Sequence, residues 1–441
     1  MTGESPFPHW TCPAGEIRGW QDCAVLRATG IRYARAGRYE QPVDEPAATD
    51  VIDATHWSPA CPQPVAPLLE KLLNRPLGDL VQDEDCLRLS LTLPADLEPG
   101  EAVPVIVWIH GGSYTWGAGD APIFDPAHFV AEQRIIVASV TYRLGVFSYL
   151  GVDERPANLG LLDQLSALRW VQANIAAFGG DPGNVTVFGQ SAGADAVAHL
   201  MIAQGSQGLF HRAVIASAPF GSSGRRDEMY ARMAVTAATL PHDAPTADLV
   251  EHQARIGASA RGFGLRSAVP FGVRFGRAPL PPEAEARAAW RQAATRVPIL
   301  IGWTSRDGAM FTVPIPALER IAPWPIVGPT AVEVAVRAVT RLVFSAPATA
   351  FARRHQRAGG RGYRYELSWG PADNPYRATH TYDMALMFPA ETWWDAALIA
   401  GATREEILAA GRPVRRMLAD FVRTGTVDVR DERGLRVRPL A

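Results

Sequence analysis

The sequence predicts an α/β fold, because short apolar runs alternate with helical stretches along most of its 441 residues. These runs are apolar at consecutive positions, which is typical of strands covered on both faces of a mainly parallel sheet. Between them, residues 161–178 repeat apolar side chains at helical spacing. A late helical segment, 404–425, is expected to be interrupted near Pro413. The runs that fit strands are VPVIVWI (103–109), RIIVASVTY (134–142), VTVF (185–188), RAVIAS (212–217), VPILIG (297–302) and YRYEL (363–367).

Length and composition fit one large domain over residues 1–441, since 47% of the residues are apolar. Residues 221–290 are rich in Gly, Pro, Arg and Ala and have weak periodicity, so we expect an insertion that forms a cap or pocket wall. The 43 basic and 45 acidic residues give a net charge of −2, which argues against nucleic-acid and membrane-surface partners.

The termini and cysteines indicate a cytoplasmic protein. The sequence begins MTGESPFPHW, which lacks the features of a signal peptide, and no apolar run reaches the about 18–20 residues of a membrane span. A secreted form cut from a longer precursor remains open. The four cysteines form no C-x-x-C pair, so neither a metal site nor a redox motif is expected.

A G-x-S-x-G pattern, GQSAG at 189–193, follows a predicted strand and opens a predicted helix. Three interpretations compete: a plain tight turn, a phosphate-binding loop, or a sharp turn that exposes Ser191 as a nucleophile. A phosphate loop requires a Lys-Ser/Thr pair and a different glycine spacing, so that interpretation fails. The strand–turn–helix context favours a nucleophile elbow, in which small flanking residues permit a strained turn.

A nucleophilic serine needs donors for the oxyanion that forms when it attacks. The segment IHGGSYTWGAG (109–119) ends a predicted strand in glycines, which let backbone N–H groups approach a substrate closely. We therefore expect the N–H groups of Gly111, Gly112 and Ala192 to form an oxyanion hole.

The serine also needs a histidine base, oriented by a carboxylate that lies between the two in the sequence. His380 is the preferred base because it lies in a polar loop before an apolar stretch, whereas His355 is expected at a solvated helix end. The other histidines after Ser191 lie too near it or in the irregular insertion: His199, His211, His242 and His252.

Asp307 is the preferred acid. It follows the predicted strand 297–302, and residues just past the carboxyl ends of strands gather at α/β sites. Glu283 and Glu285 instead resemble solvated charges at the start of a helix.

The chain resembles the type-B carboxylesterases, a family of α/β-hydrolases that includes bacterial p-nitrobenzyl-type esterases, fungal lipases and cholinesterases. The resemblance implies an α/β-hydrolase fold with a mainly parallel central sheet, helices on both faces and a helical or irregular cap insertion. It also implies a small-molecule ester substrate and neither cofactor nor metal, and it leaves the oligomeric state open. Matching blocks follow in order: GIRYARAGRYEQP, EDCLRLSL, WIHGGSYTWGAG, TYRLGVFSYLG, NLGLLDQLSALRWVQANIAAFGGDPGNVTVFGQSAGA and FHRAVIASA.

Carried over residue by residue, the resemblance implies that Ser191 is the nucleophile, Asp307 the acid and His380 the base. The resemblance also implies that Ser217 lies next to the catalytic residues and helps to hold them in place. Gln190 departs from the family, which usually has Glu before the nucleophile, and Asp307 stands where the family's acid is usually Glu.

Other residues are expected to have structural roles. Cys61 and Cys86 match the family's N-terminal disulfide, although both would be thiols in a reducing cytoplasm. Ion pairs that hold loops together are expected between Arg143 and Asp181 and between Arg38 and Glu84. Three aromatic residues flank the catalytic motifs and are either pocket walls or plain core: Trp116, Trp303 and Phe388.

These observations lead us to expect a serine carboxylesterase that hydrolyses esters through an acyl-enzyme. One alternative is a hydrolase of specialised-metabolite lactones or carbamates, or an acyltransferase, that uses the same residues. A second alternative, of another class, is a non-catalytic binding protein related to the cholinesterases. The retained serine, acid and histidine argue against that second alternative.

Overall fold

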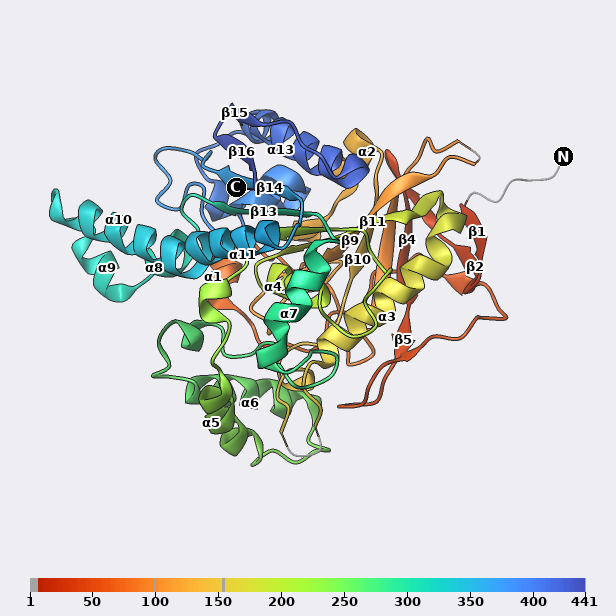
Figure 1. Ribbon diagram of the computed structural model, residues 1–441, viewed down its shortest axis with the longest axis horizontal. Helices are drawn as coiled ribbons and strands as arrows, with labels where there is room; N and C mark the ends of the chain where they lie inside the picture. Colours follow the sequence, from red (N-terminus) through yellow and green to blue (C-terminus); the bar gives the residue numbers. More distant parts are fainter. Residues whose placement is uncertain (1–6, 99, 153–154, 441) are drawn as a thin grey trace.

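A large twisted sheet forms the centre of the molecule (Figure 1). The computed structural model describes residues 7–98, 100–152 and 155–440, and within them this sheet has eleven strands. From edge to edge the order is β15 (Arg430–Glu432), β16 (Leu435–Pro439), β14 (Gly362–Leu367), β13 (Ile299–Thr304), β12 (Arg212–Ala216), β11 (Gly180–Gln190), β9 (Val103–Ile109), β10 (Ile136–Val140), β8 (Arg88–Pro94), β4 (Val25–Arg32) and β3 (Trp20–Asp22).

The middle of the sheet is parallel and its edges are antiparallel. β10, β9, β11, β12, β13 and β14 pair in parallel, whereas β8 and β16 begin the antiparallel margins. This confirms the predicted α/β fold with a mainly parallel sheet. Two small sheets join β1 (His9–Cys12), β2 (Gly15–Arg18) and β7 (Ile52–Asp53), and β5 (Ala34–Arg35) with β6 (Val43–Asp44).

Both faces of the sheet are buried, because successive residues of a strand point to opposite sides. In β9, Val105 and Val107 belong to one core cluster, and Ile106 and Trp108 belong to the other. Helices cover both faces, and Figure 1 shows α3 and α13 on opposite sides of the sheet. The helices are α1 (Pro67–Leu73), α2 (Ala127–Gln133), α3 (Leu159–Asn174), α4 (Ala192–Leu200), α5 (Asp227–Ala237), α6 (Thr246–Ser259), α7 (Glu283–Ala294), α8 (Ala309–Thr312), α9 (Pro316–Ile321), α10 (Val327–Val339), α11 (Ala346–Arg357), α12 (Tyr382–Met387) and α13 (Arg404–Thr424).

The expected interruption at Pro413 is wrong, since α13 continues through it as one helix. A proline lacks the N–H that would bind the carbonyl four residues earlier. That carbonyl belongs to Ala409, and it accepts a hydrogen bond from Arg433 Nη1 at 3.0 Å. The replacement donor removes the cost of leaving the carbonyl unpaired.

The segment 221–290 is more regular than its composition indicates. It contains α5 and α6, which form a separate lobe in Figure 1, and the first residues of α7. A hydrogen bond connects this lobe to the segment that follows β10. Gln253 Oε1, on α6, accepts it from Val146 N–H at 3.0 Å. Its role as a cap over the site stays a prediction.

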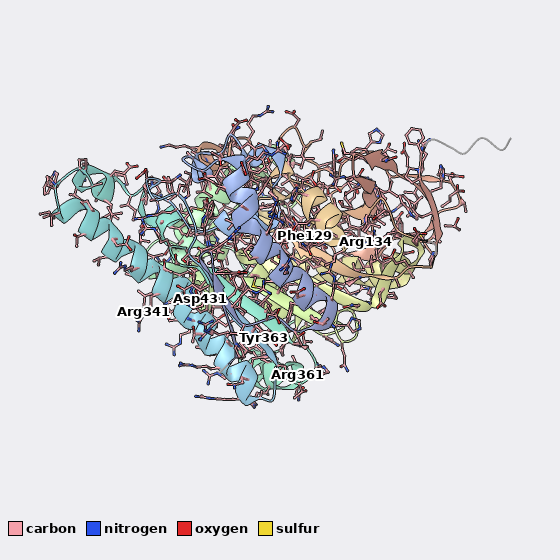
Figure 2. All side chains as sticks on the ribbon, turned by 90° about the horizontal axis from the view of Figure 1, so that it is seen from above. Phe129, Arg134, Arg341, Arg361, Tyr363 and Asp431 are labelled. Atoms are coloured by element: carbon pink, nitrogen blue, oxygen red, sulfur yellow. The ribbon has the colours of Figure 1, made fainter. Side chains whose placement is uncertain are left out.

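One helical segment meets the length and composition of a membrane span, contrary to expectation. Residues Val327–Arg357 form a continuous helix with a mean hydropathy of 1.2 over its most apolar window, of which 33% is buried. Figure 2 shows this helix along one margin of the molecule, with Arg341 near its middle. The core helices of soluble proteins can have the same length and composition. Within this helix Glu333 pairs with Arg306 and Arg337, which is typical of a water-exposed surface.

One expected ion pair forms and the other does not. Arg38 pairs with Glu84, as predicted. Arg143 binds Asp163 rather than Asp181, with Arg143 Nη2 and Asp163 Oδ1 2.6 Å apart and both side chains buried. Asp163 reaches Arg143 because it lies on the inner face of α3, whereas Asp181 caps a turn by accepting from a backbone N–H.

Cys61 and Cys86 are buried free thiols in this structure, so the disulfide implied by the family resemblance is not formed. A hydrogen bond with Cys61, together with burial, raises the pKa of Cys86 well above its ordinary value. Residues 1–6, on which the absence of signal-peptide features partly rests, lie outside the described residues.

Candidate active site

Ser191 stands at the sharp turn between β11 and α4, where its backbone is strained. Its φ of 57° and ψ of −125° lie outside the regions that side-chain-bearing residues prefer. The turn is held by the Ser191 N–H, which donates to Ala216 O at 2.9 Å on the next strand. The geometry is that of the predicted nucleophile elbow.

The two flanking glycines are required by close backbone approaches. A Cβ at Gly189 would lie 2.3 Å from Gly193 O, and one at Gly193 would lie 2.1 Å from Ile109 O. Any larger residue would push α4 away from β9 or open the turn. The GxSxG spacing therefore follows from packing as well as from the need for a tight turn.

The loop after β9 packs directly against the elbow. A Cβ at Gly111 would lie 3.0 Å from Ser191 Cβ, so this glycine permits the contact. His110 fixes the loop: its ring stacks on Tyr142 at 4.4 Å, and Tyr142 OH donates to His110 O at 2.7 Å. Burial lowers the pKa of His110 to about 4, so it is neutral and structural at physiological pH.

Three backbone N–H groups remain available at this junction. Among the described residues, none accepts a hydrogen bond from the N–H of Gly111, Gly112 or Ala192. Ala192 is the first residue of α4, where N–H groups have no partner within the helix and the helix dipole is positive. The three groups are those expected to form an oxyanion hole, and they can bind a developing negative charge.

Asp307 and His380 meet as expected. Asp307 follows β13, His380 lies between β14 and α12, and His380 Nδ1 is 2.8 Å from Asp307 Oδ1. Both side chains are buried. The other carboxylate oxygen, Oδ2, accepts from Ser217 Oγ at 3.1 Å and from Thr304 N–H at 3.1 Å. The Nδ1–H of the ring can therefore donate to Asp307, which leaves Nε2 as the acceptor on the other side of the ring.

The side chain of Gln190 makes a polar contact with Nε2 of His380. Gln190 Nε2 lies 3.3 Å from His380 Nε2, so the amide N–H can donate to the ring. In the described part of the chain, no hydrogen bond joins Ser191 Oγ to this ring. Catalytic hydrogen bonds are often long without substrate. The polar contact between His380 and the elbow in this structure is the one with Gln190, the residue that precedes Ser191.

Comparison with known proteins identifies the family of the chain. Residues 8–320 match the model of the Carboxylesterase family. The chain belongs to the carboxylesterase family. It is accordingly a carboxylic ester hydrolase, as its resemblance to type-B carboxylesterases predicts.

Relatives match over most of their length. The chain is 37% identical over 431 residues to a probable N-octanoylanthranilate hydrolase of Rhodococcus erythropolis, covering 96% of this chain and 94% of that protein. It is 33% identical over 418 residues to the para-nitrobenzyl esterase of Bacillus subtilis, covering 86% and 82%. The solved structure of a thermophilic PNB esterase matches with a TM-score of 0.82 at 29% identity, covering 98% and 97% of the two chains.

The aromatic residues that contact His380 in this carboxylesterase are not the three that flank the catalytic motifs. Phe388 is not a pocket wall, because it is fully buried in the core, where it packs on Trp108 at 5.5 Å. Trp116 is also buried, and Trp303 lines a surface groove beside α11. The rings that contact His380 are Phe344 at 4.9 Å and Phe311 at 5.3 Å. Phe311 is 42% exposed, and nothing in its local sequence marks it as a neighbour of His380.

We predict that Gln190→Glu moves the acidic limb of the pH profile of kcat/KM to higher pH. A carboxylate in place of the amide 3.3 Å from Nε2 stabilises the protonated ring and removes a donor to the neutral one. The ring must be neutral to act as a base, so more alkaline solution is then needed. Profiles of both enzymes on one neutral ester check this, and a limb that stays in place or moves to lower pH contradicts it.

Asp383, three residues after the base, is a buried acid. Burial and then the charge of Asp307 raise the pKa of Asp383 to about 8. Among the described residues no side chain binds its carboxyl oxygens, and the nearby backbone N–H groups of Asp383 and Met384 oppose the rise only in part. The group is therefore protonated in the folded enzyme at neutral pH and takes no part as an anion.

Asp383→Asn is expected to stabilise the enzyme increasingly as pH rises. An unfolded Asp ionises near pH 3.9. Between about pH 4 and 8 the folded state thus holds a proton that the unfolded chain releases, and stability falls with rising pH. Asn has no proton to lose. Melting temperatures of both proteins at pH 5, 6, 7 and 8 should diverge progressively, and a constant difference would contradict the assignment.

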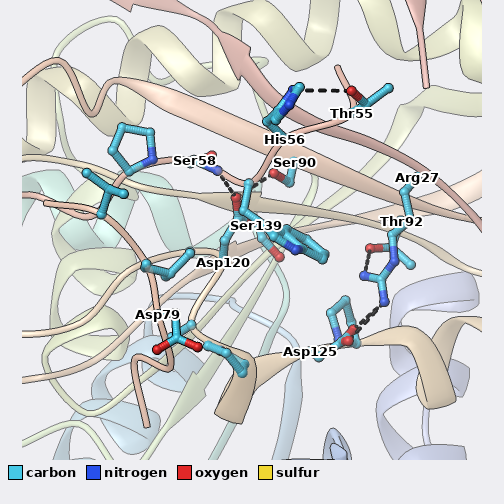
Figure 3. Close-up of a pocket in the computed structure, with 18 residues that line it drawn as sticks. Arg27, Thr55, His56, Ser58, Asp79, Ser90, Thr92, Asp120, Asp125 and Ser139 are labelled. Atoms are coloured by element: carbon cyan, nitrogen blue, oxygen red, sulfur yellow. Dashed lines mark hydrogen bonds and ion pairs between the residues drawn. The ribbon is translucent and has the colours of Figure 1, made fainter. Parts of the chain in front are cut away.

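A cavity of about 670 Å³ beside β4 and β8 lies away from this site (Figure 3). In it Asp120 accepts from Ser58 N–H at 2.7 Å and from Ser90 Oγ at 2.7 Å, and burial raises its pKa. These bonds fasten the loop before α1 to the sheet, which gives Asp120 a structural role. Among the described residues, no group of three or more His, Cys, Asp or Glu side chains is placed to hold a metal.

Proposed function

We propose that the enzyme hydrolyses carboxylic esters through an acyl-enzyme on Ser191. The observation that carries the proposal is the bond between Asp307 and His380, set beside a strained serine whose neighbouring backbone N–H groups are unpaired. This combination supplies a base, its orienting acid, a nucleophile and donors for the oxyanion.

In the first half-reaction, His380 Nε2 takes the proton of Ser191 Oγ as the oxygen attacks the ester carbonyl carbon. The carbonyl oxygen becomes an oxyanion, which accepts hydrogen bonds from the N–H groups of Gly111, Gly112 and Ala192. When the tetrahedral intermediate collapses, the bond to the alcohol oxygen breaks and His380 gives that oxygen the proton. Asp307 keeps the ring oriented throughout and stabilises its charged form.

In the second half-reaction, water replaces the alcohol. His380 takes a proton from water, whose oxygen attacks the acyl carbon. Collapse returns the proton to Ser191 and releases the carboxylic acid. Neither half-reaction needs a group from outside the chain and its substrates.

The experiment is a series of p-nitrophenyl esters with acyl chains from two to twelve carbons. We expect hydrolysis with a maximum of kcat/KM at one chain length. An initial burst of p-nitrophenol, equal to the enzyme concentration, is expected wherever deacylation is slower than acylation. Absence of hydrolysis across the series would refute the proposal.

A second candidate activity is cleavage of an N-acyl bond to an aromatic amine. It is favoured by the 37% identity over 96% of this chain to a protein named a probable N-octanoylanthranilate hydrolase. The same residues can perform it, because His380 can protonate a leaving amine as it does an alcohol. Comparing kcat/KM for N-octanoylanthranilate and p-nitrophenyl octanoate, which share one acyl group, separates the two.

A carbamate remains a further substrate class, since a phenmedipham hydrolase of Pseudarthrobacter oxydans is 38% identical over 244 residues.

A further inference from the structure

A second cavity, outside the catalytic residues, lies in a groove between α7 and α11. It measures about 440 Å³, within the range of small-molecule sites, and it is lined by neither Ser191, Asp307 nor His380. Figure 1 shows the two helices beside each other on the side of the sheet that α4 covers. We call it the α7–α11 groove.

The walls of the α7–α11 groove are aromatic. Phe220 stacks on Phe351 at 5.1 Å, and Trp290 contacts Phe351 at 5.9 Å and Phe275 at 6.1 Å. The indole N–H of Trp290 donates to Ala198 O at 2.9 Å, which fixes the ring. The groove therefore exists without a ligand and presents flat apolar surfaces that suit a planar ring.

Four arginines surround these walls. Arg287 and Arg291 come from α7, and Arg354 and Arg357 come from α11. In the described chain none of the four forms an ion pair. Glu283 also lines the groove, but the four arginines outnumber it, so the net charge of the lining is positive. Burial, and then the charge of Arg287, lower the pKa of Arg354, so the two guanidinium groups repel each other.

Helix electrostatics explain only part of this cluster. Arg354 and Arg357 lie in the last turn of α11 and Arg291 in the last turn of α7, where cations are favourable. The helix dipole does not explain why the last turn of α11 faces Arg287 of α7 across the same cavity. An anion between them would relieve the repulsion.

His355, expected to be solvated, is in fact buried in the wall of this groove. It is 4% exposed, and the turn before β14 packs on its ring, since a Cβ at Gly360 would lie 2.3 Å from His355 Cδ2. Burial lowers its pKa to about 4, so it is neutral at physiological pH. Its Nε2 lies against that turn, where a Cβ at Gly360 would be 2.4 Å away, so the ring is a structural part of the groove wall.

We propose that the α7–α11 groove binds a planar aromatic carboxylate. The ring lies against Trp290 and Phe351, and the carboxylate is held by Arg287 and Arg354. Arginine suits this role because its planar donors match the two oxygens of a carboxylate. The proposal stands apart from the catalytic assignment, since it uses different residues and a different cavity.

The test uses 2-naphthoate as the probe and 2-naphthylmethanol as its neutral counterpart, with binding followed by calorimetry. The double variant Arg287→Gln/Arg354→Gln should bind naphthoate at least about tenfold more weakly, because each charge-assisted bond is strong. Binding of the neutral alcohol should change little. Hydrolysis of p-nitrophenyl acetate should also be unchanged, which shows that the variant is folded.

The matched control is Arg412→Gln/Arg416→Gln. It removes the same charge from exposed positions on α13, which packs on the opposite face of the sheet. It should bind naphthoate as the wild type does. The proposal is overturned if the wild type does not bind naphthoate, if the groove variant binds it unchanged, or if the control loses as much affinity as the groove variant.

Discussion

Ser191→Ala is expected to lower kcat/KM for p-nitrophenyl esters by on the order of 10⁶-fold while leaving the fold intact. The oxyanion donors would remain, yet no group could form the acyl-enzyme. Ser191 Oγ makes no hydrogen bond with any described residue, so its removal leaves no partner unpaired. Alanine keeps the single Cβ for which the strained turn has room.

The measurement pairs initial rates with a thermal melt. A melting temperature close to that of the wild type, with activity at background, matches the expectation. Retained activity would mean that another residue is the nucleophile, and the elbow would then be a structural turn.

Asp307→Asn is expected to lower kcat by about 10⁴-fold, as in the serine-protease triad. Asp307 Oδ2 accepts two hydrogen bonds, from Ser217 and Thr304, so the amide oxygen of an asparagine must occupy that position. Its NH₂ group would then face Nδ1 of His380 and force the ring proton onto Nε2. In this tautomer the ring cannot accept the proton of Ser191.

Asp383→Asn is the matched control for this substitution. It also exchanges a buried acid for an amide, three residues from His380, but the acid is already protonated at neutral pH because its pKa is raised to about 8. Its kcat at pH 7 should stay within severalfold of the wild type. Equal losses in the two variants would contradict the specific role given to Asp307.

The parts of the site that the sequence predicts are those fixed by local backbone constraints. The glycines at 189 and 193 mark the elbow because no Cβ fits there, and Asp307 is found because it follows a clearly apolar strand. Asp307 and His380 come together because neighbouring parallel strands, β13 and β14, bring their carboxyl ends to the same edge.

The features that the sequence does not predict depend on contacts between distant segments. Arg143 pairs with Asp163 because of the rotation of α3 about its axis, which no local pattern reveals. Pro413 fails to break α13 because Arg433, on a later hairpin, supplies the missing donor. His355 is buried, with the turn at Gly360 packed on its ring, despite the basic residues around it. Phe344 and Phe311 contact His380 from a segment with no motif.

The central claim is that Ser191 is the nucleophile, and covalent labelling tests it most directly. The wild-type enzyme is treated with an organophosphate ester, digested with protease and sequenced by mass spectrometry. We predict one adduct per chain, on Ser191, appearing in parallel with loss of esterase activity. An adduct on another residue that accompanies inactivation, or complete inactivation with Ser191 unmodified, would contradict the account.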